Sequence, residues 1–198
     1  MRLAGGCTRR YLQGMATHNL QGMGPCRRLL AALAAAVVLL PAQALAASTS
    51  TRATRSALAH ALLTSRELWA TIDVCNPIDQ PYYVGIRGSM PGDGQGHDRM
   101  YMSFRLQYLD GASGHWVNLV AASSSYAAVG AGKAARQGGR SFQLVAGKSA
   151  FTLRGVVDFQ WRRGSTVLQS AARTTTAGHH SLAGADPAGF SAATCPIA

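Results

Sequence analysis

The stretch that most constrains the fold is Phe151–Arg163, FTLRGVVDFQWRR. Apolar and polar residues alternate from Phe151 to Arg162, with Val156 as the one exception. Such a period of two is typical of a β-strand with one face against a core and the other towards water. An apolar strand face needs a second layer of structure to cover it, and we expect this cover mainly from residues 99–109 and the first strand. We expect Phe151, Leu153, Gly155, Val157, Phe159 and Trp161 to point inwards, and Arg154, Asp158 and Arg162 to form an ordinary solvated surface.

Similar short segments, separated by turns, fill most of the chain after residue 66. Residues 99–109, RMYMSFRLQYL, form the second long candidate strand. The further candidates are 67–75, 82–87, 115–120, 141–145 and 165–173, with a short edge strand near Tyr126. About seven strands at fairly regular spacing predict an all-β fold, an antiparallel β-sandwich formed by residues 67–198 as one domain.

The N-terminal part of the chain predicts export. Residues 29–40, LLAALAAAVVLL, form an uncharged run that follows Arg27 and Arg28, and the small residues Ala44 and Ala46 come after it. These are the three parts of a secretory signal peptide, so we expect cleavage after Ala46. The run is short for a transmembrane helix. Residues 1–46 are therefore interpreted as a signal peptide with surplus upstream residues, and 47–66 as a flexible lead-in.

Two details of export stay open at this point. Met1, Met15 and Met23 are alternative starts of translation, and arginine pairs precede the apolar run at two places. These pairs loosely fit a twin-arginine signal, although the general secretory route is favoured. No transmembrane segment is expected in the mature chain, which we place outside the cell or at the cell wall.

The positive charge of the chain is smaller once the leader is set aside. The whole chain carries +11, but five of its 19 basic residues precede residue 47, which leaves 14 against 8 acidic residues. The remaining charges are dispersed, with the densest group at Lys133, Arg136 and Arg140. A nucleic-acid site would need clustered charge with interleaved aromatic residues, so no nucleic-acid partner is expected.

Cysteine usage agrees with an exported protein. Cys7 and Cys26 lie in the predicted leader, and Cys75 and Cys195 remain as an even pair. Such a pair in an exported chain predicts a disulfide bond. It would close a loop of about 120 residues and contribute about 4–5 kcal/mol to stability in the chain-entropy model.

Several segments carry a resemblance to known proteins. They include VCNP, GIRGSMPG, RMYMSFRLQY, LRGVVDFQWRRG and the tail TTTAGHHS followed by ADPAGFSAATC. The chain resembles a group of uncharacterised secreted proteins of high-GC Gram-positive bacteria, over most of residues 67–197. The order of its aromatic-rich strands also looks like an immunoglobulin or fibronectin type III domain. The resemblance implies export and an immunoglobulin-like sandwich, and it implies no activity.

Two sets of histidines suggest metal binding. His97, Met100 and Met102 combine imidazole and thioether groups, which suit copper in an exported protein. The competing interpretation is that both methionines fill the core, because they share parity with Phe104 and Leu106. His179 and His180, with Asp186, form a weaker candidate metal site. No cofactor is expected.

The sequence contains no catalytic motif that we recognise. There is no G-x-S-x-G or H-E-x-x-H pattern, and Glu67 is the only glutamate. A hydrolase would have to assemble His115, His179 or His180 with distant aspartate and serine residues. We therefore expect a protein that is not an enzyme, with an unrecognised hydrolase as an alternative.

Aromatic residues supply the remaining hypothesis. Trp69, Tyr101 and Trp116 lie on strands whose alternation turns some of them outwards, where aromatic rings suit carbohydrate or protein binding. The sequence thus predicts a secreted, non-catalytic β-sandwich that binds a partner, such as a cell-envelope polymer or another protein. A copper-binding protein is the alternative from a different class.

Overall fold

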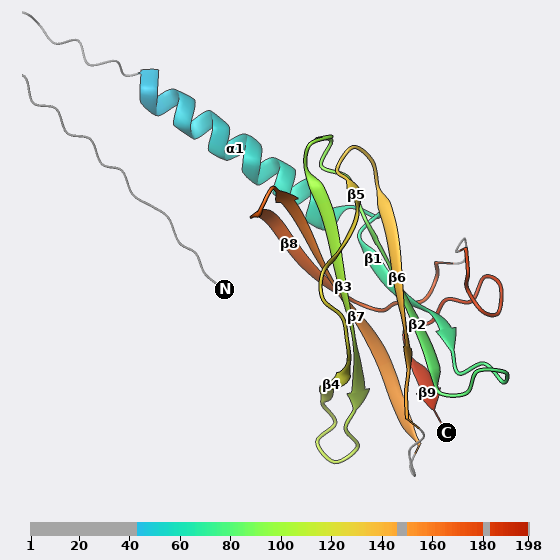
Figure 1. Cartoon of the computed structure of the whole chain (residues 1–198). Helices are drawn as coiled ribbons and strands as arrows, with labels where there is room; N and C mark the ends of the chain where they lie inside the picture. Colours follow the sequence, from blue (N-terminus) through green and yellow to red (C-terminus); the bar gives the residue numbers. More distant parts are fainter. Residues whose placement is uncertain (1–42, 146–149, 180–182, 198) are drawn as a thin grey trace, which may run out of the picture. The chain divides into compact units, whose positions relative to one another are not determined.

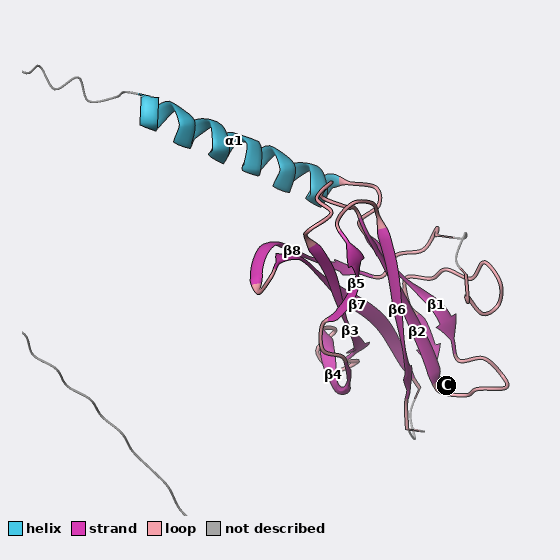
Figure 2. Ribbon diagram, turned by 45° about the horizontal axis from the view of Figure 1, so that its top comes forward, coloured by secondary structure: helices cyan, strands magenta, loops and turns pink. Residues whose placement is uncertain are grey.

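The computed structural model describes residues 43–145, 150–179 and 183–197. Most of the predicted signal peptide, and His180, lie outside these residues. Strands in two sheets and one helix form the regular structure of these residues (Figures 1 and 2). The elements in order are α1 Gln43–Thr64, β1 Trp69–Cys75, β2 Tyr83–Met90, β3 Arg99–Leu109, β4 Trp116–Ser123, β5 Ala127–Ala131, β6 Arg136–Gln143, β7 Phe151–Arg163, β8 Thr166–Thr174 and β9 Cys195–Ile197.

The strands form two antiparallel sheets that pack together, as the alternating pattern predicts. The smaller sheet has the order β1-β2-β6, and the larger has the order β4-β3-β7-β8. Two short strands complete the larger sheet, since β5 pairs with β3 beyond β4, and β9 pairs with the start of β7. The hairpin from β7 to β8 turns at Gly164, whose φ of 59° favours glycine. The predicted return of residues 165–173 beside the long strand is therefore confirmed.

The core lies between the inner faces of β7 and β2. Leu153, Val157, Phe159 and Trp161 of β7 are fully buried. Glycine allows the sheets to approach closely, because a Cβ on Gly155 would lie 2.9 Å from Ile86 Cδ1. The expectation that residues 99–109 cover the apolar face of β7 is wrong. β3 pairs with β7 in the same sheet, whereas the first strand, β1, lies in the opposite sheet and covers β7 together with β2, as expected for that strand.

A disulfide bond joins the two sheets. Cys75 at the end of β1 is bonded to Cys195 at the start of β9, with their Cα atoms 5.5 Å apart. The predicted pairing is confirmed, and the bond spans 120 residues of sequence. It anchors the C-terminal segment, which crosses from β8 to β1 and then reaches β7 through β9.

The flexible lead-in that we expected over 47–66 is instead largely helical. Helix α1 covers 22 residues, and its C-terminal end packs against the sandwich. Leu62 belongs to the core, and the Leu63 carbonyl accepts a hydrogen bond from Arg173 Nη2 at 2.6 Å. These tertiary contacts supply the stability that a weakly amphipathic helix lacks by itself. No helix within the described residues has the length and apolar character needed to cross a membrane.

Candidate binding face

The outer face of the larger sheet presents the alternate residues of β3 and β7. Its register places Gln107 opposite Arg154, Ser103 opposite Asp158, and Tyr101 opposite Gln160. The inward residues between them are apolar and buried, which directs the polar residues outwards. The name arginine–aromatic face is used below for this surface, formed by Tyr101, Arg105, Gln107, Trp116, Tyr126, Arg154, Asp158, Gln160 and Arg162.

One end of the face is built around Arg154 and Trp116. The guanidinium carbon of Arg154 lies 4.3 Å from the Trp116 ring centroid, which is within the range of a cation–π contact. Arg154 Nε donates to Gln107 Oε1 at 2.8 Å, and Gln107 Nε2 donates to Asn118 Oδ1 at 2.8 Å. Burial lowers the pKa of the Arg154 guanidinium, which nevertheless remains charged at neutral pH. The charge of Arg154 is thus held in place by neutral groups.

The other end repeats this arrangement around Arg162. Its guanidinium carbon lies 4.3 Å from the Tyr101 ring centroid and 4.9 Å from that of Tyr126. Arg162 Nε donates to Gln160 Oε1 at 2.7 Å. Each end therefore combines an arginine, aromatic rings and a glutamine.

An ion pair occupies the middle of the face. Arg105 of β3 donates from Nη1 to Asp158 Oδ2 of β7. Asp158 is the acidic residue of the face, whereas Arg105, Arg154 and Arg162 are basic, and Arg99 lies opposite Arg162. The face therefore carries an excess of positive charge.

Trp69, the third predicted binding aromatic, lies elsewhere. It is on the outer side of the smaller sheet, where its ring stacks on His179 with centroids 4.1 Å apart. The structure thus brings Tyr101 and Trp116 to one face and uses Trp69 to hold the C-terminal segment.

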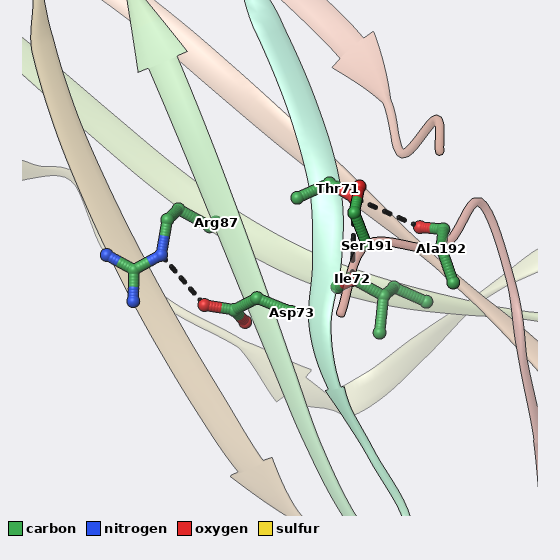
Figure 3. Close-up of polar contacts among 6 residues, drawn as sticks. All are labelled: Thr71, Ile72, Asp73, Arg87, Ser191 and Ala192. Carbon is green, nitrogen blue, oxygen red and sulfur yellow. Dashed lines mark hydrogen bonds and ion pairs between the residues drawn. The ribbon is translucent and has the colours of Figure 1, made fainter. Parts of the chain in front are cut away.

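The C-terminal segment covers β1 through polar contacts (Figure 3). Thr71 Oγ1 and Ser191 Oγ lie 2.8 Å apart, and Ile72 and Ala192 exchange backbone hydrogen bonds of 2.9 and 3.0 Å. Asp73 forms an ion pair with Arg87 at 2.8 Å beside this segment. As a result, Thr71 and Asp73 are buried although they occupy the polar side of β1. The alternation in the sequence contains no signal of this cover.

The residues of the copper hypothesis have different environments. Met100 and Met102 are fully buried in the core with Leu106. The His97 side chain is 59% exposed, and its Nε2 lies 3.4 Å from Asp98 Oδ1. Among the described residues, no group of three or more histidine, cysteine, aspartate or glutamate side chains is arranged to hold a metal ion. These positions favour core packing as the role of both methionines.

A buried carboxyl pair lies at the far end of the sandwich. Asp98 is 1% exposed and accepts hydrogen bonds from Arg163 Nε at 2.7 Å and Nη2 at 2.9 Å. These bonds hold the pKa of the Asp98 carboxyl below its usual range. Burial raises the pKa of Asp93, and a hydrogen bond with Asp98 adds to this effect. Sequence reasoning missed this pair because it lies in a glycine-rich loop without regular periodicity.

The carboxyl pair borders a cavity of about 620 Å³ between α1 and the β7–β8 hairpin. Leu58 and Leu62 of the helix line it, together with Val167 and Leu168 of β8. A backbone hydrogen bond also fixes the glycine-rich loop that precedes β3, because Gly132 N donates to Asp98 O at 2.9 Å. We interpret Asp98 as a structural anchor of the loop.

Comparison with known proteins identifies no family. No family model matches the chain, and no curated protein is significantly similar to it. The resemblance to uncharacterised secreted proteins therefore stays a prediction.

His115 and His179, the described histidines of the hydrolase alternative, do not line the cavity beside α1. The Ser191 hydroxyl accepts from the backbone N–H of His179 at 2.9 Å, while the His179 ring lies near Thr176 and on Trp69. His115 is the last residue of the β3–β4 loop, where its carbonyl accepts a hydrogen bond from the Asp110 N–H at 2.9 Å.

The carboxyl pair predicts opposite effects of two matched substitutions. Asp98→Asn lowers stability at pH 7, because it removes the charge that Arg163 binds. Asp93→Asn leaves stability at pH 7 unchanged or raised, because the amide resembles the neutral acid that burial favours. Urea unfolding between pH 2 and pH 7 measures both effects.

The two carboxyls also differ in their pH dependence. The lowered pKa of folded Asp98 gives stability that is present above the unfolded value of about 3.9 and is lost as the pH falls through the folded value. The raised pKa of Asp93 gives stability that is present below the unfolded value and is lost as the pH rises through the folded value. If Asp93→Asn lowered the free energy of unfolding at pH 7 more than Asp98→Asn did, the directions given for the two pKa values would be contradicted.

Proposed function

We propose that the protein is a secreted, non-catalytic binding module of the cell envelope or the surrounding medium, and that it binds its partner through the arginine–aromatic face. The observation that carries this proposal is the pair of guanidinium groups, Arg154 and Arg162, each of which lies on an aromatic ring and bonds to a neutral glutamine. If these arginines served only to stabilise the fold, carboxylate partners would stabilise it more than the neutral glutamines do, because charge-assisted hydrogen bonds are stronger.

The remaining surfaces are less suited to this role. The C-terminal segment covers much of the outer side of β1 in the smaller sheet. The outer side of the larger sheet has no comparable segment across it among the described residues. A broad sheet face that stays accessible favours binding of an extended partner.

The strand order and the disulfide support the rest of the proposal. An immunoglobulin-type sandwich is part of this proposal, and the strand orders β1-β2-β6 and β4-β3-β7-β8 support it because they match A-B-E and C′-C-F-G. A disulfide bond is typical of proteins outside the cytoplasm, where it persists. Sandwiches of this type serve many functions, so the proposal rests on the face rather than on the fold.

Capture on envelope fractions tests this function. We expect the double variant Arg154→Ala/Arg162→Ala to lose at least about 10-fold in affinity, since charged anchors at an interface contribute several kcal/mol. The matched control is Arg66→Ala/Arg140→Ala, which removes the same charge from exposed sites outside the face. Both variants should keep the unfolding midpoint close to that of the wild type.

Equal losses in the two variants would contradict the proposal, because non-specific attraction by net charge would then explain the binding. The proposal would also be contradicted if the wild-type protein bound envelope fractions no better than the Arg154→Ala/Arg162→Ala variant does.

A further inference from the structure

We infer that the partner of the arginine–aromatic face is a linear acidic polysaccharide whose carboxylate groups bind Arg154 and Arg162. This inference rests on the proposed function and specifies the chemistry of the ligand. Three features of the face support it: the free donors of the two arginines, their separation, and the polar surface between them.

The two arginines retain most of their hydrogen-bonding capacity. Each uses Nε to bond to a glutamine oxygen, while its guanidinium plane is held by an aromatic contact. No hydrogen bond from the terminal nitrogens of either arginine to a described residue is present. A planar guanidinium with these donors available matches a carboxylate in a two-bond arrangement. Because both side chains are already ordered, binding costs less conformational entropy.

The separation of the two arginines selects an extended ligand. They lie on one face of β7, eight residues apart, which corresponds to roughly 26 Å along a strand. A small anion reaches one of these sites, whereas a linear chain with repeated charges reaches both. Simultaneous contact at two sites raises the affinity without any new type of contact.

The exposed surface between the arginines is polar, and Val156, the apolar residue on this side of β7 between them, is buried. This surface holds Ser103 and the Arg105–Asp158 ion pair, with the amide of Gln160 beside them. The large exposed apolar residues within the described chain lie at its margins or elsewhere, and include Leu109, Val117 and Leu168. A protein partner normally meets an apolar centre with a polar rim. A polar centre with hydroxyl and amide groups instead suits a chain rich in hydroxyl groups.

The net positive charge of the chain agrees with an acidic ligand. Residues 47–198 contain 14 basic and 8 acidic residues, and the face itself has more arginine than aspartate. Electrostatic attraction would therefore increase the rate at which an acidic polymer associates.

The test measures the binding of galacturonate oligomers of increasing length to the purified protein by titration calorimetry at fixed ionic strength. We expect the monomer to bind weakly and oligomers long enough to span both arginines to bind at least about 10-fold more tightly. Arg154→Ala and Arg162→Ala should each reduce the affinity for long oligomers to that for short ones. Fully methyl-esterified oligomers, which have the same sugar backbone without the charge, should bind no better than the monomer.

Several results would overturn the inference. They are equal affinity for short and long oligomers, equal affinity for the methyl esters, and unchanged binding by the two arginine variants. The inference would also be overturned if the protein did not bind galacturonate oligomers at all.

A second experiment distinguishes failure of this inference from failure of the proposed function. Envelope fractions are treated either with protease or with periodate, which cleaves sugar diols, before capture of the protein. Arginine-dependent capture that survives protease and is lost after periodate supports the polysaccharide. Arginine-dependent capture lost only after protease overturns the polysaccharide and leaves the binding face intact. Capture that does not depend on Arg154 and Arg162 overturns both.

Discussion

Replacing both Cys75 and Cys195 with serine is expected to lower the free energy of unfolding by about 4–5 kcal/mol. The bond closes a loop across 120 residues, and in the chain-entropy model so long a loop strongly restricts the unfolded chain. For a domain of this size, such a loss corresponds to a melting temperature roughly 10–20 °C lower. Differential scanning calorimetry under non-reducing conditions measures the difference.

The double serine variant also provides the control for reducing agents. Dithiothreitol should lower the melting temperature of the wild-type protein towards that of the variant and leave the variant itself unchanged. Equal melting temperatures for the two proteins without reductant would contradict a stabilising role of the bond between β1 and β9.

Trp161→Ala is expected to cost about 3–5 kcal/mol of stability, as large-to-small substitutions of buried aromatic residues do. Trp161 is fully buried in the core, with a relative exposure of 0%, and it lies opposite Met100 on β3. Its Nε1 also donates to the Pro91 carbonyl at 2.9 Å. The substitution therefore leaves both a cavity and an unpaired carbonyl, and chemical denaturation measures the total cost.

Trp161→Phe separates the two contributions. Phenylalanine keeps most of the apolar contact but cannot donate to Pro91, so the expected cost is smaller than that of alanine. A loss from Trp161→Ala of less than about 1 kcal/mol would show that Trp161 is not part of a tightly packed core.

The strands with strict alternation could be predicted from the sequence. β3 and β7 bury one face against the core and expose the other, so their period of two appears directly in the residues. The bounds of both strands were predicted correctly. The disulfide was predictable for a different reason, because the two cysteines that follow the predicted leader have only one possible intramolecular pairing.

β6 shows where this reasoning fails. The segment RQGGRSFQ has few apolar residues, and a strand was predicted only over 141–145. Its inner side is crowded, because a Cβ on Gly138 would lie 2.9 Å from Val129 Cγ1 and 3.1 Å from Met102 Sδ. Glycine is used where space is short, so the usual apolar signal is missing.

The candidate face was only partly visible in the sequence. Tyr101 and Trp116 were predicted to be exposed aromatics, but their arginine partners come from β7 and approach them through strand pairing. The alternating pattern indicates which residues point outwards. It does not indicate which side chains of neighbouring strands meet, because this depends on register and on the order of strands in the sheet. The cover of Thr71 and Asp73 by the C-terminal segment was missed for the same reason.

Hydroxyl-radical footprinting of the protein bound to envelope fractions tests the central claim most directly. The account predicts reduced oxidation of Tyr101, Trp116 and Tyr126 on binding, because the partner covers the arginine–aromatic face. Tyr83 and Trp69, on the smaller sheet, serve as internal controls whose oxidation should not change. Protection of Tyr83 or Trp69 without protection of Tyr101 and Trp116 would show that the protein binds through another surface.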